Sequence, residues 1–182
     1  DIRMGSETRR WQAAYELSNL VSSQKDKLRN PEFVDNVVAL YQGSRGGDPR
    51  IRQFLALTMG HLGDSKAVPS LIEGLNDQQV ETQIYTLWAL GSIADKSAAS
   101  AIVKELGSED AAVRKTAAYV LGSIKDPGTV HDLQVALNDT SQDVRWNAAM
   151  ALAQLKDASG ADLLMNLADR SYLEKIEGMT PE

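Results

Sequence analysis

The sequence contains no cysteine and only two histidines, His61 and His131. Disulfide bridges and thiolate chemistry are therefore excluded. Two imidazoles are too few for most zinc sites and catalytic triads, and we expect each histidine to be a surface or interface residue rather than a ligand. We therefore expect no catalytic residue, no metal site and no cofactor, and we predict that the chain is not an enzyme.

Excess positive charge and long apolar runs are also lacking. The net charge of -6 over 182 residues argues against broad binding to nucleic acid or to anionic membranes. No apolar run has the length of a membrane span, and no signal peptide is visible. The chain begins with Asp1 rather than Met, so we expect a shortened or processed product and leave an N-terminal signal or anchor open. A cytoplasmic location is the expectation for the residues present.

Aromatic residues are scarce as well, at 5% of the chain, whereas apolar residues make up 43% and charged residues 24%. This balance is typical of a soluble, folded protein rather than a disordered one. Alanine and leucine are plentiful, which favours closely packed helices.

The residues that are present repeat with a step of 31. Segment 113–126 reads VRKTAAYVLGSIKD, and segment 144–157 reads VRWNAAMALAQLKD. A fixed period of this length is the signature of a repeat architecture. Five columns of similar residues follow the step: Gly60, Gly91, Gly122 and Ala153; Met59, Leu90, Leu121 and Leu152; Leu62, Ile93, Ile124 and Leu155; Asp64, Asp95, Asp126 and Asp157; and Leu71, Ile102, Leu133 and Leu164.

Each unit is predicted to hold two helices. Val113, Ala117 and Leu121 fall on one face of the first helix. The small residue that recurs in this helix, such as Gly122, indicates a close approach between neighbouring helices, since glycine otherwise weakens a helix. The aspartate that follows, such as Asp126, is placed to cap the second helix. Short loops make the two helices antiparallel neighbours.

Stacked hairpins of this kind form an all-α fold, an α-solenoid. We predict one repeat domain over residues 1–177, followed by a tail at 178–182. The expected units are about 8–47, 48–77, 78–108, 109–139 and 140–170.

Two units depart from the pattern. In the first, we expect a helix over 11–20, a linker SSQKDKLRNP, a helix at about 32–42 and a flexible turn GSRGGDP. In the third, the segment from Val80 to Gly91 is two residues longer than the segment from Val113 to Gly122. The first helix of the third unit is therefore expected to start earlier or to swing outward.

The fourth unit carries a family resemblance. VRKTAAYVLGSIKDPGTVHDLQVALND, residues 113–139, resembles the short HEAT-like repeats first described in phycobilisome lyases. The resemblance covers about residues 8–169 and implies the α-solenoid. It does not imply one function, because these repeats serve lyases, hydroxylases, nucleic-acid-binding proteins and bacterial adaptors alike.

One enzymatic branch can be tested by residue. Deoxyhypusine hydroxylases resemble such arrays with His-Glu pairs at the two positions after Val-Arg, where several pairs bind iron. In this sequence the corresponding positions hold Lys115-Thr116 and Trp146-Asn147, and no His-Glu dipeptide occurs anywhere. We therefore reject that activity.

The same two positions collect aromatic residues across the units, and we expect them to point away from the packing face. Tryptophan and tyrosine are favoured as interface anchors. The position before them is basic in four units, which suits a partner with carboxylates beside apolar groups. The paired positions are Trp11 and Gln12, Gln53 and Phe54, Ile84 and Tyr85, Lys115 and Thr116, and Trp146 and Asn147. The predicted partner-binding residues are Arg10, Trp11, Arg52, Gln53, Tyr85, Arg114, Lys115, Arg145, Trp146 and Asn147.

A structural interpretation of these residues stays open. The arginines would then pair with loop acids such as Asp48, Asp110 or Asp143, and the aromatic rings would fill gaps between alanine-rich helices. Trp88 and Tyr119 share another register and are expected to form a second patch or the opposite rim of the first.

The sequence thus favours a non-catalytic protein–protein interaction scaffold or adaptor that binds a protein or peptide partner, acidic in character if the arginines take part. A bilin lyase-like or other prosthetic-group-handling protein is the alternative. Nucleic-acid binding through the arginines is disfavoured by the net charge, and self-association through the ends of the solenoid stays open.

Overall fold

A computed structural model describes residues 7–169 of the chain, and every regular element in this range is helical. Each repeat consists of a first helix and a second helix. The first helices are α1 (Glu7–Leu28), α3 (Pro49–Leu62), α5 (Val80–Ile93), α7 (Ala111–Ile124) and α9 (Gln142–Gln154). The second helices are α2 (Pro31–Gln42), α4 (Val68–Gly74), α6 (Ala99–Glu105), α8 (Val130–Ala136) and α10 (Ala161–Ala168).

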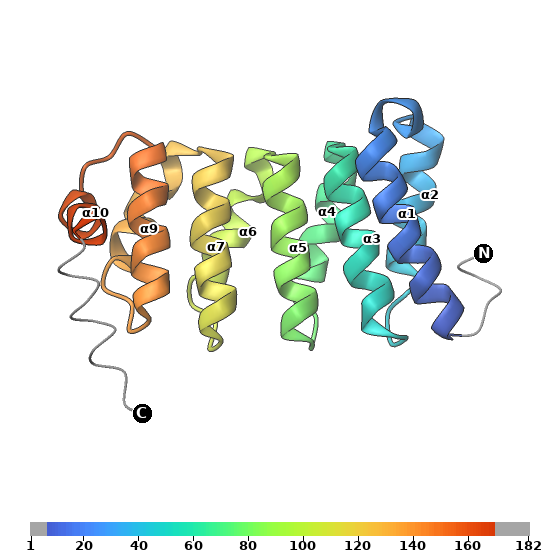
Figure 1. Cartoon of the computed structure of the whole chain (residues 1–182), viewed down its shortest axis with the longest axis horizontal. Coiled ribbons are helices and arrows are strands. Elements are labelled where there is room, and N and C mark those ends of the chain that lie inside the picture. The colour runs from blue at the N-terminus through green and yellow to red at the C-terminus, as the bar shows by residue number, and fades with distance from the viewer. Residues whose placement is uncertain (1–6, 170–182) are drawn as a thin grey trace.

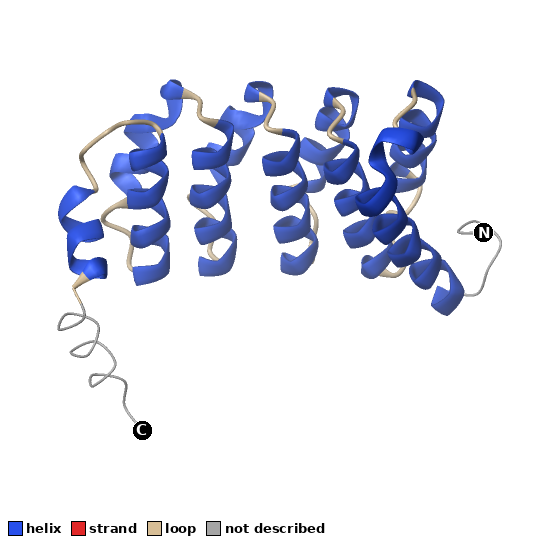
Figure 2. Ribbon diagram, turned by 45° about the horizontal axis from the view of Figure 1, so that its top comes forward, coloured by secondary structure: helices blue, strands red, loops and turns tan. Residues whose placement is uncertain are grey.

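The helices form two layers. The first helices stand side by side in one row, and most of the second helices lie behind them (Figures 1 and 2). One continuous core of alanine, leucine, valine and isoleucine runs between the layers. The predicted all-α solenoid is confirmed. The predicted tail at 178–182 lies outside the described residues, as does the predicted domain end at 177.

The first unit differs from the sequence prediction. Most of the segment expected to be a linker is helical, because α1 continues to Leu28 with a single break at Gln24, where φ is -134° and ψ is 30°. The chain then turns at Asn30, whose side chain accepts a hydrogen bond of 2.9 Å from the backbone N–H of Phe33. Asn30 caps α2 in this way, and Pro31 occupies its first turn.

The third unit is regular, so the prediction of an early or displaced helix is wrong. Helix α5 begins at Val80 and α7 begins at Ala111, which is one full step of the repeat. Thr82 therefore takes the place of Val113, and both side chains are fully buried. The two extra residues expected in the third unit resulted from aligning Val80 with Val113, whereas Thr82 is the residue equivalent to Val113. Threonine has the branched shape of valine, which explains why it fills the same core position.

The recurring glycines lie where consecutive first helices approach closely, as predicted, and two of the three permit backbone contact. A Cβ on Gly60 would lie 2.8 Å from the Cα of Ala89, and one on Gly122 would lie 2.9 Å from the Cα of Ala151. Gly91 instead faces the methyl groups of Val120, at 3.1 and 3.2 Å. A side chain thus separates α5 from α7, whereas backbones meet between α3 and α5 and between α7 and α9.

The four aspartates of the repeat column make the same cap. Each carboxylate accepts a hydrogen bond of 2.9 to 3.0 Å from the backbone N–H two residues later. In three units the capped segment is a short 3₁₀ turn that leads into the second helix. These turns are Ser65–Ala67, Lys96–Ala98 and Pro127–Thr129. The predicted capping role is confirmed.

The glycine contacts generate a stability prediction. Gly60→Ala is expected to lower the free energy of unfolding by about 1–2 kcal/mol, because its methyl group would press on the backbone of Ala89 and outweigh the gain in helix propensity. Gly91→Ala is the matched control and is expected to be close to neutral, since it meets only side-chain atoms of Val120. Urea denaturation measures both. Equal losses in the two variants would contradict the backbone-contact explanation.

Candidate functional site

The arginine column predicted from the sequence holds the loops of the repeat. Arg114 on α7 forms two bonds to the Asp139 carboxylate, from Nε at 2.8 Å and from Nη2 at 3.0 Å. Its Nη1 donates to the backbone carbonyls of Ser108 at 2.9 Å and Glu109 at 3.1 Å. Because both side chains of the ion pair are largely buried, the guanidinium joins two loops and presents little surface to a partner.

The neighbouring units use the same position in the same way. Arg145 donates from Nη1 to the carbonyls of Asp139 at 2.8 Å and Thr140 at 3.1 Å. Gln83, which interrupts the arginine column, donates to the carbonyl of Asp77 at 2.7 Å. Like Arg114, both side chains reach back to a carbonyl of the loop that precedes their helix. The shared role of the column is to close this loop ahead of the first helix.

Arg52 is the most buried member, with 4% of its surface exposed. Its Nε lies 2.9 Å from Asp77 Oδ2, and its Nη1 donates to the Tyr41 carbonyl at 3.3 Å. The guanidinium also lies 4.4 Å from the centre of the Tyr41 ring, a cation–π arrangement. Arg52 thus ties α3 to α2 and to the loop after α4.

The acids in these pairs are Asp77 and Asp139, each in the loop after the second helix of its own unit, and not the loop acids considered from the sequence. Asp48 pairs with Arg50 instead, at 2.6 Å. Asp143 pairs with Lys115 at 3.2 Å, and Asp110 caps α7. The acids that follow the second helix lie nearer because the hairpin returns the chain to the start of its own first helix.

The aromatic residues at the predicted positions are half-buried rather than fully outward. Trp11 packs on the core beneath the Arg50 guanidinium, which lies 4.4 Å from the ring centre. Tyr85 meets Phe54 edge-on at 6.3 Å, and Trp146 is half-buried. These positions lie where adjacent first helices touch, so only part of each ring faces outward.

The remaining predicted residues lie around these rings. Thr116 is buried and donates to the Ala112 carbonyl at 2.7 Å, so the expectation that it points away from the packing face is wrong. Asn147 donates to the Asp143 carbonyl at 2.7 Å. Gln53 donates to Thr82 Oγ1 at 3.4 Å. Arg10 is half-exposed in the first turn of α1. Of the two histidines, His61 is half-buried on α3 and His131 is exposed on α8.

A second set of residues lies further outward, three or four positions along each first helix. We call Tyr15, Leu57, Trp88, Tyr119 and Met150 the outer row. Four of them are exposed, at 41 to 42% of their surface. The rings of Trp88 and Tyr119 approach to 4.9 Å, which confirms that they form one patch. The constant repeat step from Leu57 to Met150 was the signal that could have found four of the five members, whereas Tyr15 lies outside this step.

The surface around the outer row carries almost no charge. Four stretches of the first helices contain no Asp, Glu, Lys or Arg, in a chain of which 24% is charged. Burial, aided by the charge of Lys25, lowers the pKa of His61, so this imidazole is neutral at pH 7. Charge depletion with Trp, Tyr and Met is typical of the core of a protein interface. The stretches are 53–62, 84–93, 116–124 and 146–154.

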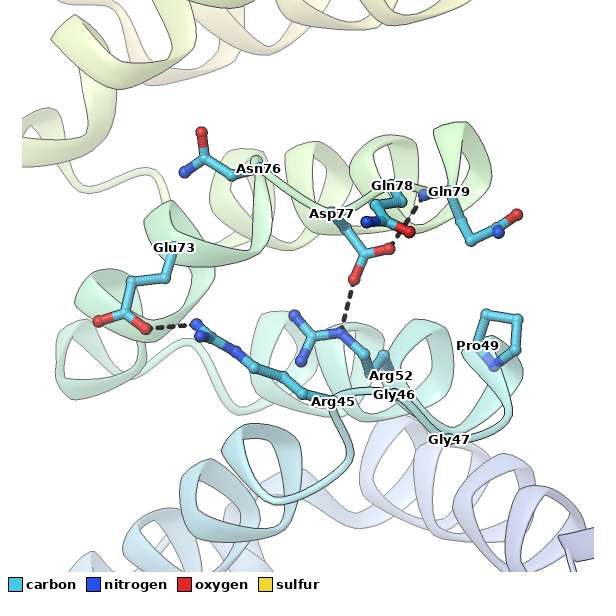
Figure 3. A pocket seen from close by; sticks show the side chains of 10 residues that line it. All are labelled: Arg45, Gly46, Gly47, Pro49, Arg52, Glu73, Asn76, Asp77, Gln78 and Gln79. Atoms are coloured by element: carbon cyan, nitrogen blue, oxygen red, sulfur yellow. Dashed lines mark hydrogen bonds and ion pairs between the residues drawn. The ribbon is translucent and has the colours of Figure 1, made fainter.

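A polar recess of about 810 Å³ lies between the loop after α2 and the loop after α4 (Figure 3). Two ion pairs cross it, Arg45 to Glu73 at 2.6 Å and Arg52 to Asp77. Its lining includes no aromatic residue, histidine or cysteine. Among the described residues, no group of three His, Cys, Asp or Glu side chains could hold a metal ion. The lining residues are Arg45, Gly46, Gly47, Pro49, Arg52, Glu73, Asn76, Asp77, Gln78 and Gln79.

Tyr41 of α2 joins three repeats through its side chain. The hydroxyl lies 3.3 Å from Thr86 Oγ1 on α5 and fills the space where Gly74 of α4 has no Cβ. Burial raises the pKa of Tyr41 above its ordinary value, so the phenol is uncharged at neutral pH. The buried phenol thus connects the second repeat to both of its neighbours, whereas the pair of Arg52 with Asp77 lies within the second repeat.

Comparison with known proteins identifies the family of the repeat. The family model of HEAT repeats matches residues 68–138 and 99–175, and the model of the PBS lyase HEAT-like repeat matches residues 51–77. The chain belongs to the HEAT repeat family. No curated protein matches this HEAT repeat chain in sequence. No helix within residues 7–169 is long and apolar enough to cross a membrane.

Several solved structures share the fold of this HEAT repeat protein. One is the complex of CpcE and CpcF of phycocyanin lyase from Nostoc sp. PCC7120, at 23% identity and a TM-score of 0.73, covering 93% of this chain and 68% of that one. Another is a designed armadillo repeat protein in complex with the peptide (KR)4, at 19% identity and a TM-score of 0.68, covering 100% and 90%. At these identities the likeness shows the fold alone.

The Asp139 pair generates a pH prediction. Its hydrogen bonds from Arg114 come first among the causes that lower the pKa of Asp139. The carboxylate therefore stabilises the fold above its unfolded pKa of about 3.9, and this contribution is lost as the pH falls through the lower folded value. Asp139→Asn is expected to cost about 1.5–3 kcal/mol at pH 7 and progressively less below about pH 4.

Urea denaturation of both proteins at several pH values measures this difference. Asp143→Asn is the matched control, because its pair with Lys115 is exposed on both sides, and it is expected to cost at most about 0.5 kcal/mol. A cost of Asp139→Asn that does not change between pH 7 and pH 3 would contradict the assigned role of the charge.

The Tyr41 contact generates a double-mutant prediction. Gly74→Ala is expected to destabilise the protein by about 1–3 kcal/mol, because the new methyl group would overlap the Tyr41 hydroxyl. In a Tyr41→Phe background the same change is expected to cost less, by about 1 kcal/mol, since the overlapping atom is gone. Thermal and urea unfolding of the four proteins measure the coupling, and purely additive losses would refute it.

Proposed function

We propose that this protein is a non-catalytic scaffold that binds a protein partner across the outer face of its first helices. The observation that carries the proposal is the outer row, a largely exposed aromatic and apolar line on a surface with almost no charged side chains. Trp and Tyr bury large areas at little entropic cost, and they are enriched among the residues that dominate binding energy. The structural neighbours include a two-protein complex and a peptide complex, which accords with a binding role.

The residues predicted from the sequence divide into two roles in this proposal. Trp11, Tyr85 and Trp146 extend the apolar surface beside the outer row, and Gln53, Lys115 and Asn147 supply polar groups near it. The arginines Arg52, Arg114 and Arg145 keep the loops in place, and Arg10 lies at the edge of the surface. Because each of these three arginines already bonds to groups of its own chain, the proposal does not require an acidic partner.

The hydrogen bonds and ion pairs of these arginines also weaken the nucleic-acid alternative, which requires arginines that can bind phosphate groups along the repeats. A lyase-like or prosthetic-group role would need an apolar pocket with aromatic contacts. The recess of Figure 3 is lined instead by charged and amide side chains. The proposed protein-binding role depends on the outer row and does not involve the recess.

An affinity capture from the lysate of the source organism tests the proposal. Trp88→Ala combined with Tyr119→Ala is expected to lose a partner that the unchanged chain retains, because the centre of the apolar surface is removed. Val135→Ser is the matched control, since Val135 is 61% exposed but lies on the second helix α8. This control is expected to retain the partner. Circular dichroism verifies that all three proteins are folded.

Capture of the same partner by the double variant and the unchanged chain would show that the surface is not the binding site. Coloured material that copurifies with the unchanged chain, together with no protein partner, would favour the prosthetic-group alternative instead.

A further inference from the structure

We propose that the polar recess between the loop after α2 and the loop after α4 is a second binding site, whose ligand is a carboxylate group. This site goes beyond the protein-binding role of the outer row and shares no residue with that row. Three observations support it: a buried arginine whose donors are only partly used, an exposed ion pair that opens at little cost, and amide side chains that make no hydrogen bonds within the described chain.

Arg52 is more deeply buried than its counterpart Arg114 in the fourth repeat, yet it makes fewer hydrogen bonds. Its side chain is 5% exposed, against 13% for Arg114. Arg114 makes four side-chain hydrogen bonds, whereas Arg52 makes one, from Nη1 to the Tyr41 carbonyl at 3.3 Å. The buried Nε of Arg52 lies 2.9 Å from Asp77 Oδ2 but is not aligned for a hydrogen bond, and Nη2 donates to no described group. Buried donors without acceptors are unfavourable, so this guanidinium requires a further acceptor.

The course of the loop ahead of α3 explains why Arg52 makes so few bonds. In the last three repeats the equivalent side chain donates to the backbone carbonyl six residues earlier: Gln83 to Asp77, Arg114 to Ser108, and Arg145 to Asp139. For Arg52 that carbonyl belongs to Gly46 and accepts no bond from it. The loop, residues 43–48, is one residue longer than the loop 75–79 and turns at Gly46 with a φ of 75°. Gly46 and Gly47 line the recess beside Arg52, so a ligand oxygen can take the place of the loop carbonyl.

Arg45 supplies a second guanidinium to the recess (Figure 3). Its Nη2 lies 2.6 Å from Glu73 Oε2, and the two side chains are 60% and 59% exposed. A pair this exposed adds little to stability, so Arg45 can exchange Glu73 for a carboxylate of a ligand at little cost. The planar donors of a guanidinium match the two oxygens of a carboxylate. Arg45 and Arg52 together therefore favour this chemical group.

The charges of the lining favour a carboxylate over a phosphate. Two guanidinium groups and two carboxylates line the recess, so its side chains carry no net charge. Glu73 and Asp77 would repel a phosphate dianion more strongly than a carboxylate with a single charge.

The remaining lining is suited to a main chain. The amide side chains of Asn76, Gln78 and Gln79 line the recess and make no hydrogen bonds within the described chain. An amide side chain both donates and accepts, which matches the N–H and C=O groups of a peptide. The recess of about 810 Å³ also falls within the range of small-ligand sites, roughly 300–1,000 Å³. A carboxylate at the end of a peptide therefore uses more of this lining than an isolated anion does.

Titration with small carboxylates, followed by ¹H–¹⁵N correlation spectra of the unchanged chain, tests the inference. The probes are N-acetyl-alanyl-alanine with a free carboxylate, the same dipeptide as its C-terminal amide, sodium acetate and inorganic phosphate. We expect the free acid to shift the amide signals of Gly46 and Gly47 and the Nε–H signal of Arg52. It is expected to bind at least about tenfold more tightly than the amide, because the amide loses the charge-assisted hydrogen bonds.

Variants of the exposed ion pairs provide the second readout. Arg45→Gln is expected to weaken binding of the free acid at least about fivefold, because one guanidinium is lost. Glu73→Gln is expected to strengthen it by about twofold or more, since the competing carboxylate is removed. Lys66→Gln is the matched control, because it removes one positive charge from a similarly exposed pair with Asp35 outside the recess. Its binding is expected to stay within about twofold of the unchanged chain.

The results distinguish the sources of the carboxylate. Tighter binding of the dipeptide than of acetate would assign the site to peptide ends, and equal binding of the two would assign it to small carboxylic acids. Equal binding of the acid and the amide, a preference for phosphate, or no shift at Gly46 and Arg52 with any carboxylate at millimolar concentration would each overturn the inference. Trp88→Ala combined with Tyr119→Ala is expected to leave carboxylate binding unchanged. Loss of binding in that double variant would place the carboxylate outside the recess and would also overturn it.

Discussion

Contact between the backbones of consecutive first helices is the constraint on which the other features of this protein depend. Gly60 and Gly122 allow that contact because the helices they face carry alanine at the meeting point. Close contact sets the lateral step of the row and brings equivalent positions of consecutive repeats next to each other. The exposed residues then form a line because each repeat adds the same displacement. Where Val120 replaces the alanine, a side chain fills the space between α5 and α7, and the rings of Trp88 and Tyr119 meet at the same junction.

Charged side chains in this repeat mostly serve the loops. In the last three repeats, a long polar side chain near the start of the first helix bonds to a backbone carbonyl of the loop before it, and in the second repeat Arg52 bonds to the Tyr41 carbonyl in the last turn of α2. In the second and fourth repeats an aspartate from the loop after the second helix completes an ion pair. The bonds to loop carbonyls satisfy groups that the turns leave without a helical partner. The basic column in the sequence is therefore explained by local structure, and an electrostatic partner is not needed to account for it.

In α3, α5, α7 and α9 the charged residues lie near the start of the helix, and the rest of each helix is apolar or neutral. Such a surface is costly to expose and is typical of interfaces. Its aromatic rings contact one another from repeat to repeat, as Tyr15 does with Phe54 and Phe54 with Tyr85. Because these rings already hold one another in place, the surface would lose little conformational entropy on binding.

The sequence by itself determined the repeat, its period, the close glycine contacts and the aspartate caps. Each depends on residue type at a fixed spacing, and a constant step brings the same types to the same place in every unit. It also correctly indicated two helices in each repeat, because apolar residues follow the helical period. The prediction for the third repeat was wrong because Thr82 and Val113 have similar shapes but are different residue types, so matching by residue type did not align them.

Only the tertiary structure decided which outward positions are open to a partner. Whether the arginines are free depends on where the loops return, and Asp77 and Asp139 reach them only after the hairpin closes. Likewise, the half-buried state of Tyr85 and Trp146 depends on rings and helices from neighbouring repeats. Helical periodicity gives the direction of a side chain relative to its own helix, but its exposure is set by the helix beside it. For this reason the exposure of the outer row is set by the packing of neighbouring repeats and cannot be recognised from the pattern within one unit.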